Sequence, residues 1–222
     1  MELFNFHFAN LKNKQLNYNQ FTNTYNCPSG ITTHHNYPSF KVFIENMMKT
    51  VHVNKNKKQL IIVETGTMAI SDDDDDNNNE NSVNSTLLFN NIVSKYGGIL
   101  FTCDKDKNKI DEIAKKVVSH NLRPINMDSI IFLTSLVHNL KTNDTYKTIN
   151  IHLYLDTYDK NKTDIQNSNQ CINEYNIIKP YLGKGSQILI NNAINEEFIT
   201  LIKKELPNDK LVIDKNQLLY VF

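Results

Sequence analysis

Short apolar runs alternate with amphipathic segments along most of the chain. The strongest run, residues 60–63, holds four apolar residues of which three are β-branched. Such a run is typical of a strand that is covered on both faces. Further apolar runs at 99–103, 150–155 and 186–190 predict more strands of this kind, and a short strand is expected near residues 124–127. Alternation of buried strands with helical segments indicates an α/β protein with a Rossmann-like, doubly wound and mostly parallel sheet.

Helical periodicity fills the gaps between these runs. We expect helices at 39–51, 85–96, 107–118, 130–140, 171–182 and 196–206. In the third of these, the residues expected to face inward are Ile110, Ile113, Ala114, Val117 and Val118. The polar stretch 159–169 is expected to be a loop. Residues 210–213 and 217–222 are close enough to form a hairpin, so the last strand should be antiparallel to the rest.

Two polar segments fall outside this alternation. Residues 1–37 carry scattered aromatic side chains in a polar background and predict an irregular N-terminal extension or lid on a domain of residues 38–222. Residues 71–84 include five consecutive aspartates and predict a disordered loop. The alternative is a cation site, but adjacent carboxylates repel one another and lack the alternating ligand spacing of a calcium loop.

Charge and cysteine content narrow the class of protein. The 222 residues include 24 basic and 24 acidic side chains, so no basic field attracts nucleic acid or an anionic membrane. The apolar runs are too short to cross a bilayer, and the first residues lack a signal-peptide core. The three cysteines are far apart without paired metal-binding spacing. These features predict a cytoplasmic protein with reduced thiols, no nucleic-acid partner and no membrane partner.

Polar side chains follow the predicted strands at one common edge. These side chains are Glu64, Asp104, Asp128, Asp156 and Asn191. In open α/β sheets, ligands bind beyond the carboxyl ends of the strands, near the point where strand order reverses. Carboxylates there accept hydrogen bonds from hydroxyl and amino groups, as an adenosine-like ligand would offer. The chain has no glycine-rich dinucleotide fingerprint and no phosphate-binding lysine loop, which argues against a dinucleotide or triphosphate.

Several short motifs occur in a fixed order along the chain. They are Val63-Glu-Thr-Gly-Thr67, Ser85-Thr86 at a helix start, Gly98-Ile-Leu-Phe-Thr-Cys-Asp104, Met127-Asp-Ser129, Leu153-Tyr-Leu-Asp-Thr157 and the stretch from Glu174 to Ile190. In this order and spacing, residues 59–222 resemble the class I S-adenosylmethionine (SAM)-dependent methyltransferases. The pattern is most similar to the branch of cephalosporin-hydroxylase-like and sugar O-methyltransferases. The resemblance implies a seven-stranded sheet whose last strand is reversed.

The resemblance also implies roles for individual residues. Around the methionine part of the cofactor it places Glu64, Thr65, Gly66, Thr67, Ser85 and Thr86. It makes Asp104 the acceptor for the ribose hydroxyls and Asp128 and Ser129 neighbours of the adenine. Asp156 becomes the candidate base, with Asn191 orienting a small acceptor such as a sugar or glycan precursor. Each position has a structural alternative, because Asp104, Asp106 and Ser129 can cap helices and Glu64 can anchor its own turn.

The chain departs from the family pattern in two places. Residues 68–84 lack the glycines that the family has before Ser85, and related metal-binding enzymes have an acidic pair where this chain has Asn191-Asn192. Neutral amides are poor ligands for Mg²⁺, so we expect no metal. His34 and His35 are candidates for a catalytic role on the lid, whereas His120, His138 and His152 are expected to be structural. The expected function is SAM-dependent O-methylation; the alternative is an inactive binding or scaffolding protein, and a homo-oligomer is left open.

Overall fold

A computed structural model of the chain describes residues 38–53, 59–67, 85–142, 149–159, 161–191, 196–205, 210–214 and 217–222. The predicted lid at 1–37, with His34 and His35, lies outside the described residues. So do the predicted loop at 71–84 and Asn192. Everything below concerns the described part of the chain.

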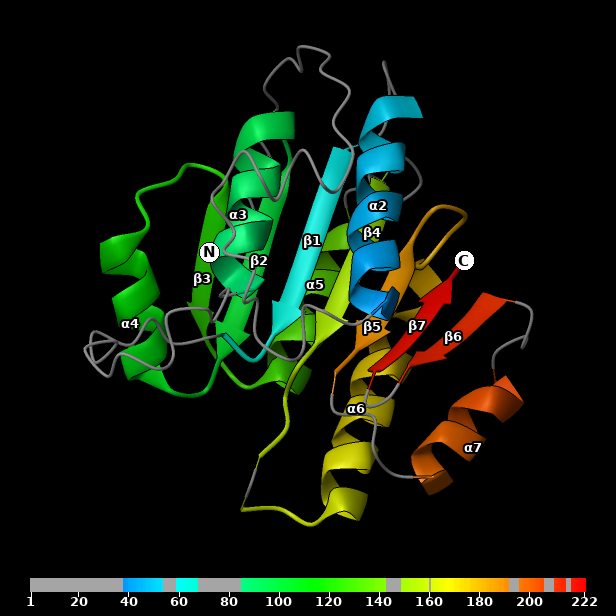
Figure 1. The fold of residues 1–222 in the computed structure, drawn as a ribbon. Coiled ribbons are helices and arrows are strands. Elements are labelled where there is room, and N and C mark those ends of the chain that lie inside the picture. Colours follow the sequence, from blue (N-terminus) through cyan, green and yellow to red (C-terminus); the bar gives the residue numbers. More distant parts are fainter. Residues whose placement is uncertain are drawn as a thin grey trace, which may run out of the picture.

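Seven strands form one sheet in the order β3-β2-β1-β4-β5-β7-β6 (Figure 1). The strands are β1 (Gln59–Thr65), β2 (Ile99–Asp104), β3 (Leu122–Asn126), β4 (Ile149–Leu155), β5 (Gln187–Ile190), β6 (Leu211–Asp214) and β7 (Gln217–Val221). The first five are mutually parallel, and β7 is antiparallel to both β5 and β6. The predicted Rossmann-like sheet of seven strands with a reversed last strand is therefore confirmed. Strand order reverses between β1 and β4.

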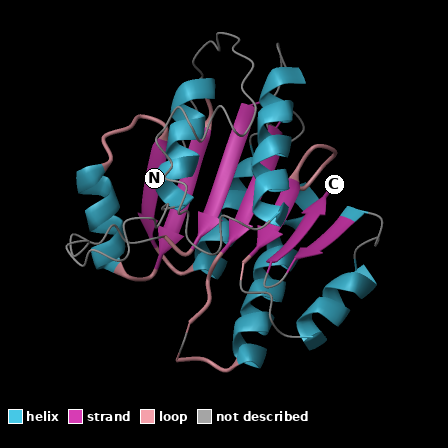
Figure 2. Cartoon of the chain, in the orientation of Figure 1, coloured by secondary structure: helices cyan, strands magenta, loops and turns pink. Residues whose placement is uncertain are grey.

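Helices cover both faces of the sheet, as Figures 1 and 2 show. One face carries α2 (Pro38–Val53), α3 (Ser85–Tyr96) and α4 (Lys107–Lys116). The other carries α5 (Ser129–Thr142) and α6 (Asp164–Ile178), which continues into the 3₁₀ helix η2 (Lys179–Tyr181), and α7 (Glu196–Glu205) packs beside α6. None of the described helices is long and apolar enough to cross a membrane.

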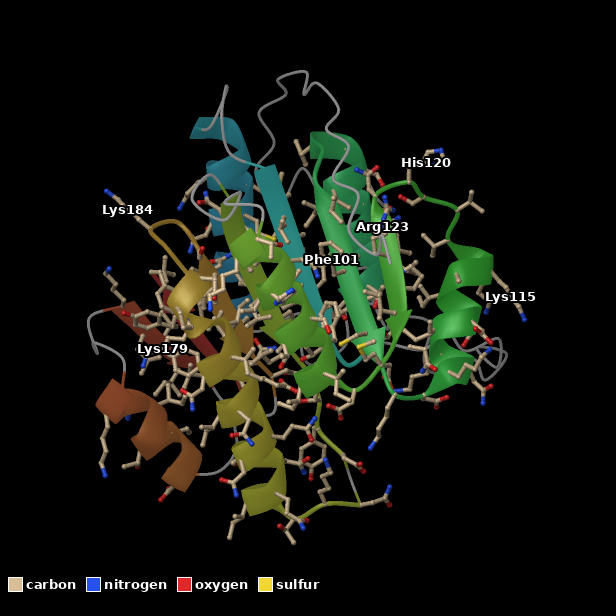
Figure 3. All side chains as sticks on the ribbon, turned by 180° about the vertical axis from the view of Figure 1, so that it is seen from behind. Phe101, Lys115, His120, Arg123, Lys179 and Lys184 are labelled. Carbon is tan, nitrogen blue, oxygen red and sulfur yellow. The ribbon has the colours of Figure 1, made fainter. Side chains whose placement is uncertain are left out.

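Burial of both faces explains why the central strand is apolar throughout. Ile61 and Val63 point into the core beneath α5 and α6, while Leu60 and Ile62 point into the core beneath α2 and α3. All four are at most 4% exposed. Phe101 of β2, labelled in Figure 3, packs against Phe132 of α5 with ring centroids 6.3 Å apart. The prediction of a strand covered on both faces is confirmed.

Two sequence predictions about helices were wrong. The α4 helix ends at Lys116, and two residues expected to face inward, Ala114 and Val118, are exposed, Val118 at 95%. Val117 is an extended cap that packs, partly buried, against the core. The chain must leave the helix there because β3 begins at Leu122. The α6 helix begins at Asp164, inside the stretch that was expected to be a loop. Its start is fixed by a capping box, in which the Thr163 and Gln166 side chains each bond to the other residue's backbone N–H.

Candidate functional site

A cavity of about 790 Å³ opens at the carboxyl ends of β1, β2, β3 and β4. Its wall comes from the ends of these strands, the loops that follow them and the first turns of α4 and α5, with one further residue from α6. The lining residues are Gly66, Thr67, Cys103, Asp104, Lys105, Asp106, Lys109, Met127, Asp128, Ser129, Asp156, Thr157, Tyr158, Asp159, Asn161, Lys162 and Gln170. Strand order reverses between β1 and β4, so the connections that leave these two strands run in opposite directions. The cavity lies where these connections separate.

Six of the eleven residues predicted for the site line this cavity. They are Gly66, Thr67, Asp104, Asp128, Ser129 and Asp156. The other five, Glu64, Thr65, Ser85, Thr86 and Asn191, are buried behind the wall. The structure therefore brings the strand ends together as expected, but it separates residues that face the cavity from residues that support it.

Glu64 is the centre of a buried cluster of hydroxyl groups. Its carboxylate accepts hydrogen bonds from the Ser85 hydroxyl at 2.5 Å, the Thr86 hydroxyl at 2.6 Å and the Thr102 hydroxyl at 2.8 Å. Thr102 also shares a 2.7 Å hydroxyl contact with Thr67 of the cavity wall. Burial raises the pKa of Glu64 to about 7, although the hydroxyl donors favour its charged form. Glu64 thus anchors the start of α3 to β1.

Gly66 allows the chain leaving β1 to pass against the chain leaving β4. Its φ is +86°, and a Cβ atom at this position would lie 2.0 Å from the carbonyl oxygen of Asp156. Its backbone N–H donates to the Cys103 carbonyl at 2.9 Å, while the Asp156 N–H donates to the Thr65 carbonyl at 2.9 Å. Only glycine fits this conformation and this contact. Gly66 therefore holds the three strand ends together at the floor of the site.

Asp104 ends β2 with its carboxylate at the cavity wall. Its Oδ1 accepts the backbone N–H of Asp106 at 2.8 Å, and its Oδ2 accepts the Lys109 ammonium at 3.2 Å. The side chain is 11% exposed. Each carboxylate oxygen can accept about two hydrogen bonds, so both retain acceptor capacity toward the cavity. Asp106 caps α4 by accepting the backbone N–H of Asn108, which is the structural role that the sequence analysis allowed for it.

Asp128 and Ser129 lie at the start of α5 and have different partners. The Asp128 carboxylate accepts the Ile130 backbone N–H at 2.9 Å and caps the helix. The Ser129 hydroxyl donates to the carboxylate of Glu174 in α6, which also accepts from the Thr65 hydroxyl at 3.3 Å. Burial raises the pKa of Glu174. Sequence reasoning assigned Glu174 no role. The sequence feature that could have identified it is an acidic residue at helical spacing between the apolar Cys171 and Ile178.

Asp156 follows β4 and faces the cavity between the β1 and β4 loops. Asn191, directly after β5, donates from Nδ2 to Asp156 Oδ1 at 3.0 Å. The hydroxyl of Tyr154, whose pKa burial raises, is hydrogen-bonded to the same carboxylate. Asn191 is 6% exposed and is absent from the cavity wall, so it contacts Asp156 and not the cavity.

Lys105 and Asp159 form an ion pair across the end of β1. Lys105 follows β2 and Asp159 follows β4, the two strands that flank β1 in the sheet, and their charged atoms are 2.8 Å apart. The Lys105 donor is the main reason why the pKa of Asp159 falls to about 2. In the same loop, the Lys162 ammonium donates to Gln170 Oε1 at 2.5 Å. Sequence reasoning predicted none of these four residues, because a solvated lysine or aspartate in a loop carries no distinguishing pattern.

The described histidines lie away from the cavity. His120 is exposed in the turn before β3 and points outward beside Arg123, which donates to its carbonyl oxygen (Figure 3). His138 is exposed on α5. His152 is fully buried in β4 against Phe43, and burial lowers its pKa to about 3. No three histidine, cysteine or acidic side chains of the described ranges are grouped as metal ligands.

Comparisons with known proteins establish the fold of this chain. No family model matches it, and no curated protein matches it in sequence. Among solved structures, it is similar to the MycE methyltransferase from the mycinamycin biosynthetic pathway in complex with Mg and SAH. The TM-score is 0.55 at 14% identity, covering 94% of this chain and 55% of that one. The MycE complex with Mg, SAH and mycinamycin VI gives 0.54 at 13% identity, covering 94% and 54%. This chain thus spans about half the length of those chains and has a methyltransferase-like Rossmann fold.

Proposed function

We propose that this chain is a SAM-dependent methyltransferase that methylates a hydroxyl group of a small acceptor. The observation that carries the proposal is the cavity of about 790 Å³ at the reversal of strand order, with Asp104 and Asp156 on its wall. This volume is within the range of small-molecule and cofactor sites. The fold shared with MycE, whose structures hold SAH and in one case mycinamycin VI, supports the same assignment.

The residues on the cavity wall suit SAM. Asp104 keeps acceptor capacity on both carboxylate oxygens, as binding a ribose diol requires. Met127 and Ser129 border the next part of the wall and offer an apolar surface and a hydroxyl for an adenine ring. Gly66 and Thr67 form the part of the wall after β1, where the methionine portion would lie. Glu64, Thr65, Ser85 and Thr86 support this wall from behind.

The charge of the wall restricts both ligands. It carries five carboxylates, Asp104, Asp106, Asp128, Asp156 and Asp159, against the ammonium groups of Lys105, Lys109 and Lys162. This leaves a formal excess of two negative charges. Each of these ammonium groups already donates to a side chain of the same wall. Such a surface favours a cation such as SAM and disfavours phosphate. We therefore infer an acceptor that is a neutral or cationic hydroxylated molecule, with a sugar as the first candidate.

Methyl transfer requires an aligned acceptor and a place for its proton. SAM supplies a methyl group activated by a positively charged sulfur. As the acceptor oxygen bonds to the methyl carbon and the carbon–sulfur bond breaks, the oxygen must lose its proton. Asp156 is the candidate base, because its carboxylate lies on the cavity wall and is held by Asn191 and Tyr154. Asn191 acts through Asp156 as a positioning residue. Alignment of the two reactants supplies the remaining acceleration.

A transfer assay with labelled SAM tests this proposal. The purified chain is incubated with methyl-labelled SAM and with neutral sugars, amino sugars or nucleotide-activated sugars, and label in the acceptor is counted. We expect transfer to a neutral or amino sugar, and loss of that transfer in Asp156→Asn. As a control, Asp111→Asn changes an exposed carboxylate on α4 that is absent from the cavity wall. SAM binding without transfer to any acceptor would instead favour the inactive binding protein.

A further inference from the structure

Three hydrogen bonds, two of them buried and the last partly buried, connect the start of α2 to the carboxylate of Asp156. The Ser39 hydroxyl donates to Gln217 Oε1 at 2.7 Å, and Gln217 Nε2 donates to Asn191 Oδ1 at 3.0 Å. Asn191 Nδ2 then donates to Asp156 Oδ1 at 3.0 Å. Ser39 and Gln217 are 0% exposed. The series thus begins in the interior of the protein and ends at the cavity wall.

These four residues come from four elements that meet at one edge of the sheet. Ser39 is the second residue of α2, Gln217 begins β7, and Asn191 and Asp156 directly follow β5 and β4. Figure 1 shows the first turn of α2 next to the start of β7, at the edge where β4 and β5 end. Because β7 is antiparallel to β5, its first residue reaches the carboxyl edge. The reversed strand therefore brings an amide to the back of the site.

All three hydrogen bonds run in the same direction. Ser39 donates to the oxygen of one amide, and that amide donates to the oxygen of the next. Since a primary amide has one acceptor end and one donor end, this order leaves Asn191 with its N–H toward Asp156. Donors aligned in series polarise one another, and in a buried setting they stabilise negative charge on the final acceptor. A carboxylate accepts and does not donate, so the direction of the series is fixed at Asp156, and Ser39 completes it as a donor to Gln217.

We propose that Gln217 is a positioning residue for the methyl-transfer base, with Ser39 donating to the oxygen of its amide. Gln217 holds the Asn191 amide with its N–H toward Asp156, and this keeps the carboxylate in one orientation at the cavity wall. The inference rests on the proposed function only in the role given to Asp156. The series of hydrogen bonds itself can be tested without a methyl acceptor.

The first test compares two buried glutamines that both contact α2 residues. Gln217→Leu removes the series, whereas Gln187→Leu removes the 2.6 Å hydrogen bond from Gln187 to the Phe43 carbonyl and leaves Asp156 untouched. Gln187 is also 0% exposed, so the two variants lose similar buried contacts. The readout is the side-chain carboxyl carbon resonance of Asp156 in protein labelled with ¹³C-aspartate, assigned with Asp156→Asn. We expect Gln217→Leu to shift this resonance and Gln187→Leu to leave it in place. The two variants should lose similar amounts of thermal stability.

A second pair of variants covers the case in which Gln217→Leu does not fold. Gln217→Met keeps the length of the side chain but cannot donate to Asn191, so the Asn191 amide loses this support and the Asp156 resonance should shift. Ser39→Ala should shift it in the same direction by a smaller amount. An Asp156 resonance that stays in place in both variants, or moves equally in Gln187→Leu, would overturn the inference. Failure of the unmodified protein to bind SAH would overturn the proposed function and leave the hydrogen-bond result standing.

Discussion

The Ser129 hydroxyl donates a hydrogen bond to the Glu174 carboxylate, which joins the first residue of α5 to the middle of α6 across 45 positions of sequence. Ser129 lies on the cavity wall, while Glu174 is buried behind it. Because Glu174 also accepts from Thr65 at the end of β1, a single carboxylate ties three elements together below the site.

Removal of Glu174 should therefore weaken both the fold and the site. Glu174→Ala leaves the Ser129 and Thr65 hydroxyls without this acceptor in a buried position, and we expect a loss of about 2 to 4 kcal/mol in the free energy of unfolding. Glu174→Gln keeps an acceptor and should lose less. Urea unfolding at neutral pH measures both. Glu112→Ala, which breaks a surface pair with Lys116, is the matched control and should cost only a few tenths of a kcal/mol. Equal losses in Glu174→Ala and Glu112→Ala would contradict the account.

Glu64 should make the protein less stable as pH rises. Its pKa is about 7 when folded and near 4.5 when unfolded, so its favourable contribution is fully present below pH 4.5 and is lost as pH rises toward 7. The limiting loss is roughly 3 kcal/mol. In Glu64→Gln, which has the same size, keeps one acceptor oxygen and does not titrate, this pH dependence should disappear. Unfolding in urea at several pH values between 4 and 8 provides the comparison. An identical pH dependence in both proteins would show that Glu64 is not the group responsible.

His152 should make the protein less stable as pH falls, which is the opposite of the effect of Glu64. Among the described residues neither of its ring nitrogens has a hydrogen-bond partner, and its pKa is about 3 when folded against about 6.5 when unfolded. The unfolded chain therefore binds the extra proton first, and stability falls as pH drops from 6.5 toward 3, by up to about 1.4 kcal/mol per pH unit. His152→Phe should be more stable than the parent at pH 5 while differing less at pH 7.5. Thermal unfolding at the two pH values tests this, and a variant that gains nothing at pH 5 would refute it.

The ion pair between Lys105 and Asp159 should control access to the cavity more than it controls stability. Lys105 is 66% exposed, so the pair contributes little to folding. Lys105→Ala and Asp159→Asn should each increase the rates of SAM binding and SAM release. In the double variant, both rates should be close to those of the single variants. Stopped-flow measurements with SAM give the two rates. Lys107→Ala, which breaks the Lys107–Asp111 pair on α4 outside the cavity wall, should leave both rates unchanged. Equal effects of Lys107→Ala and Lys105→Ala would show that the pair does not control access.

Much of this fold followed from the sequence because the central strands are buried on both faces. Residues 60–63 are typical of such a strand, and the helix expected at 85–96 is followed in the structure by two glycines with positive φ, Gly97 and Gly98. Prediction failed where tertiary contacts decide. Val118 has an apolar side chain at a helical position, yet the helix ends two residues earlier so that the chain can enter β3.

The site was predicted in part, for a similar reason. The sequence identified the polar residues at strand ends, because strand ends are readable from periodicity. It could not separate residues on the wall, such as Asp104, from residues behind it, such as Glu64, since both are acidic residues within the last two positions of a strand. Lys105, Asp159, Glu174 and Gln217 were missed because no local pattern marks them. Lys105 pairs with Asp159 across 54 positions, Glu174 bonds to Thr65 across 109 and Gln217 bonds to Ser39 across 178.

Calorimetric titration with SAM tests the central claim, that the cavity at the strand ends binds this cofactor through Asp104. The unmodified chain is compared with Asp104→Ala and with Asp111→Ala, which removes the same charge from α4 outside the cavity wall. We expect saturable binding in the micromolar range, about 8 kcal/mol, retained in Asp111→Ala and lost in Asp104→Ala. Absence of heat and of thermal stabilisation with the unmodified chain at millimolar SAM would contradict the account.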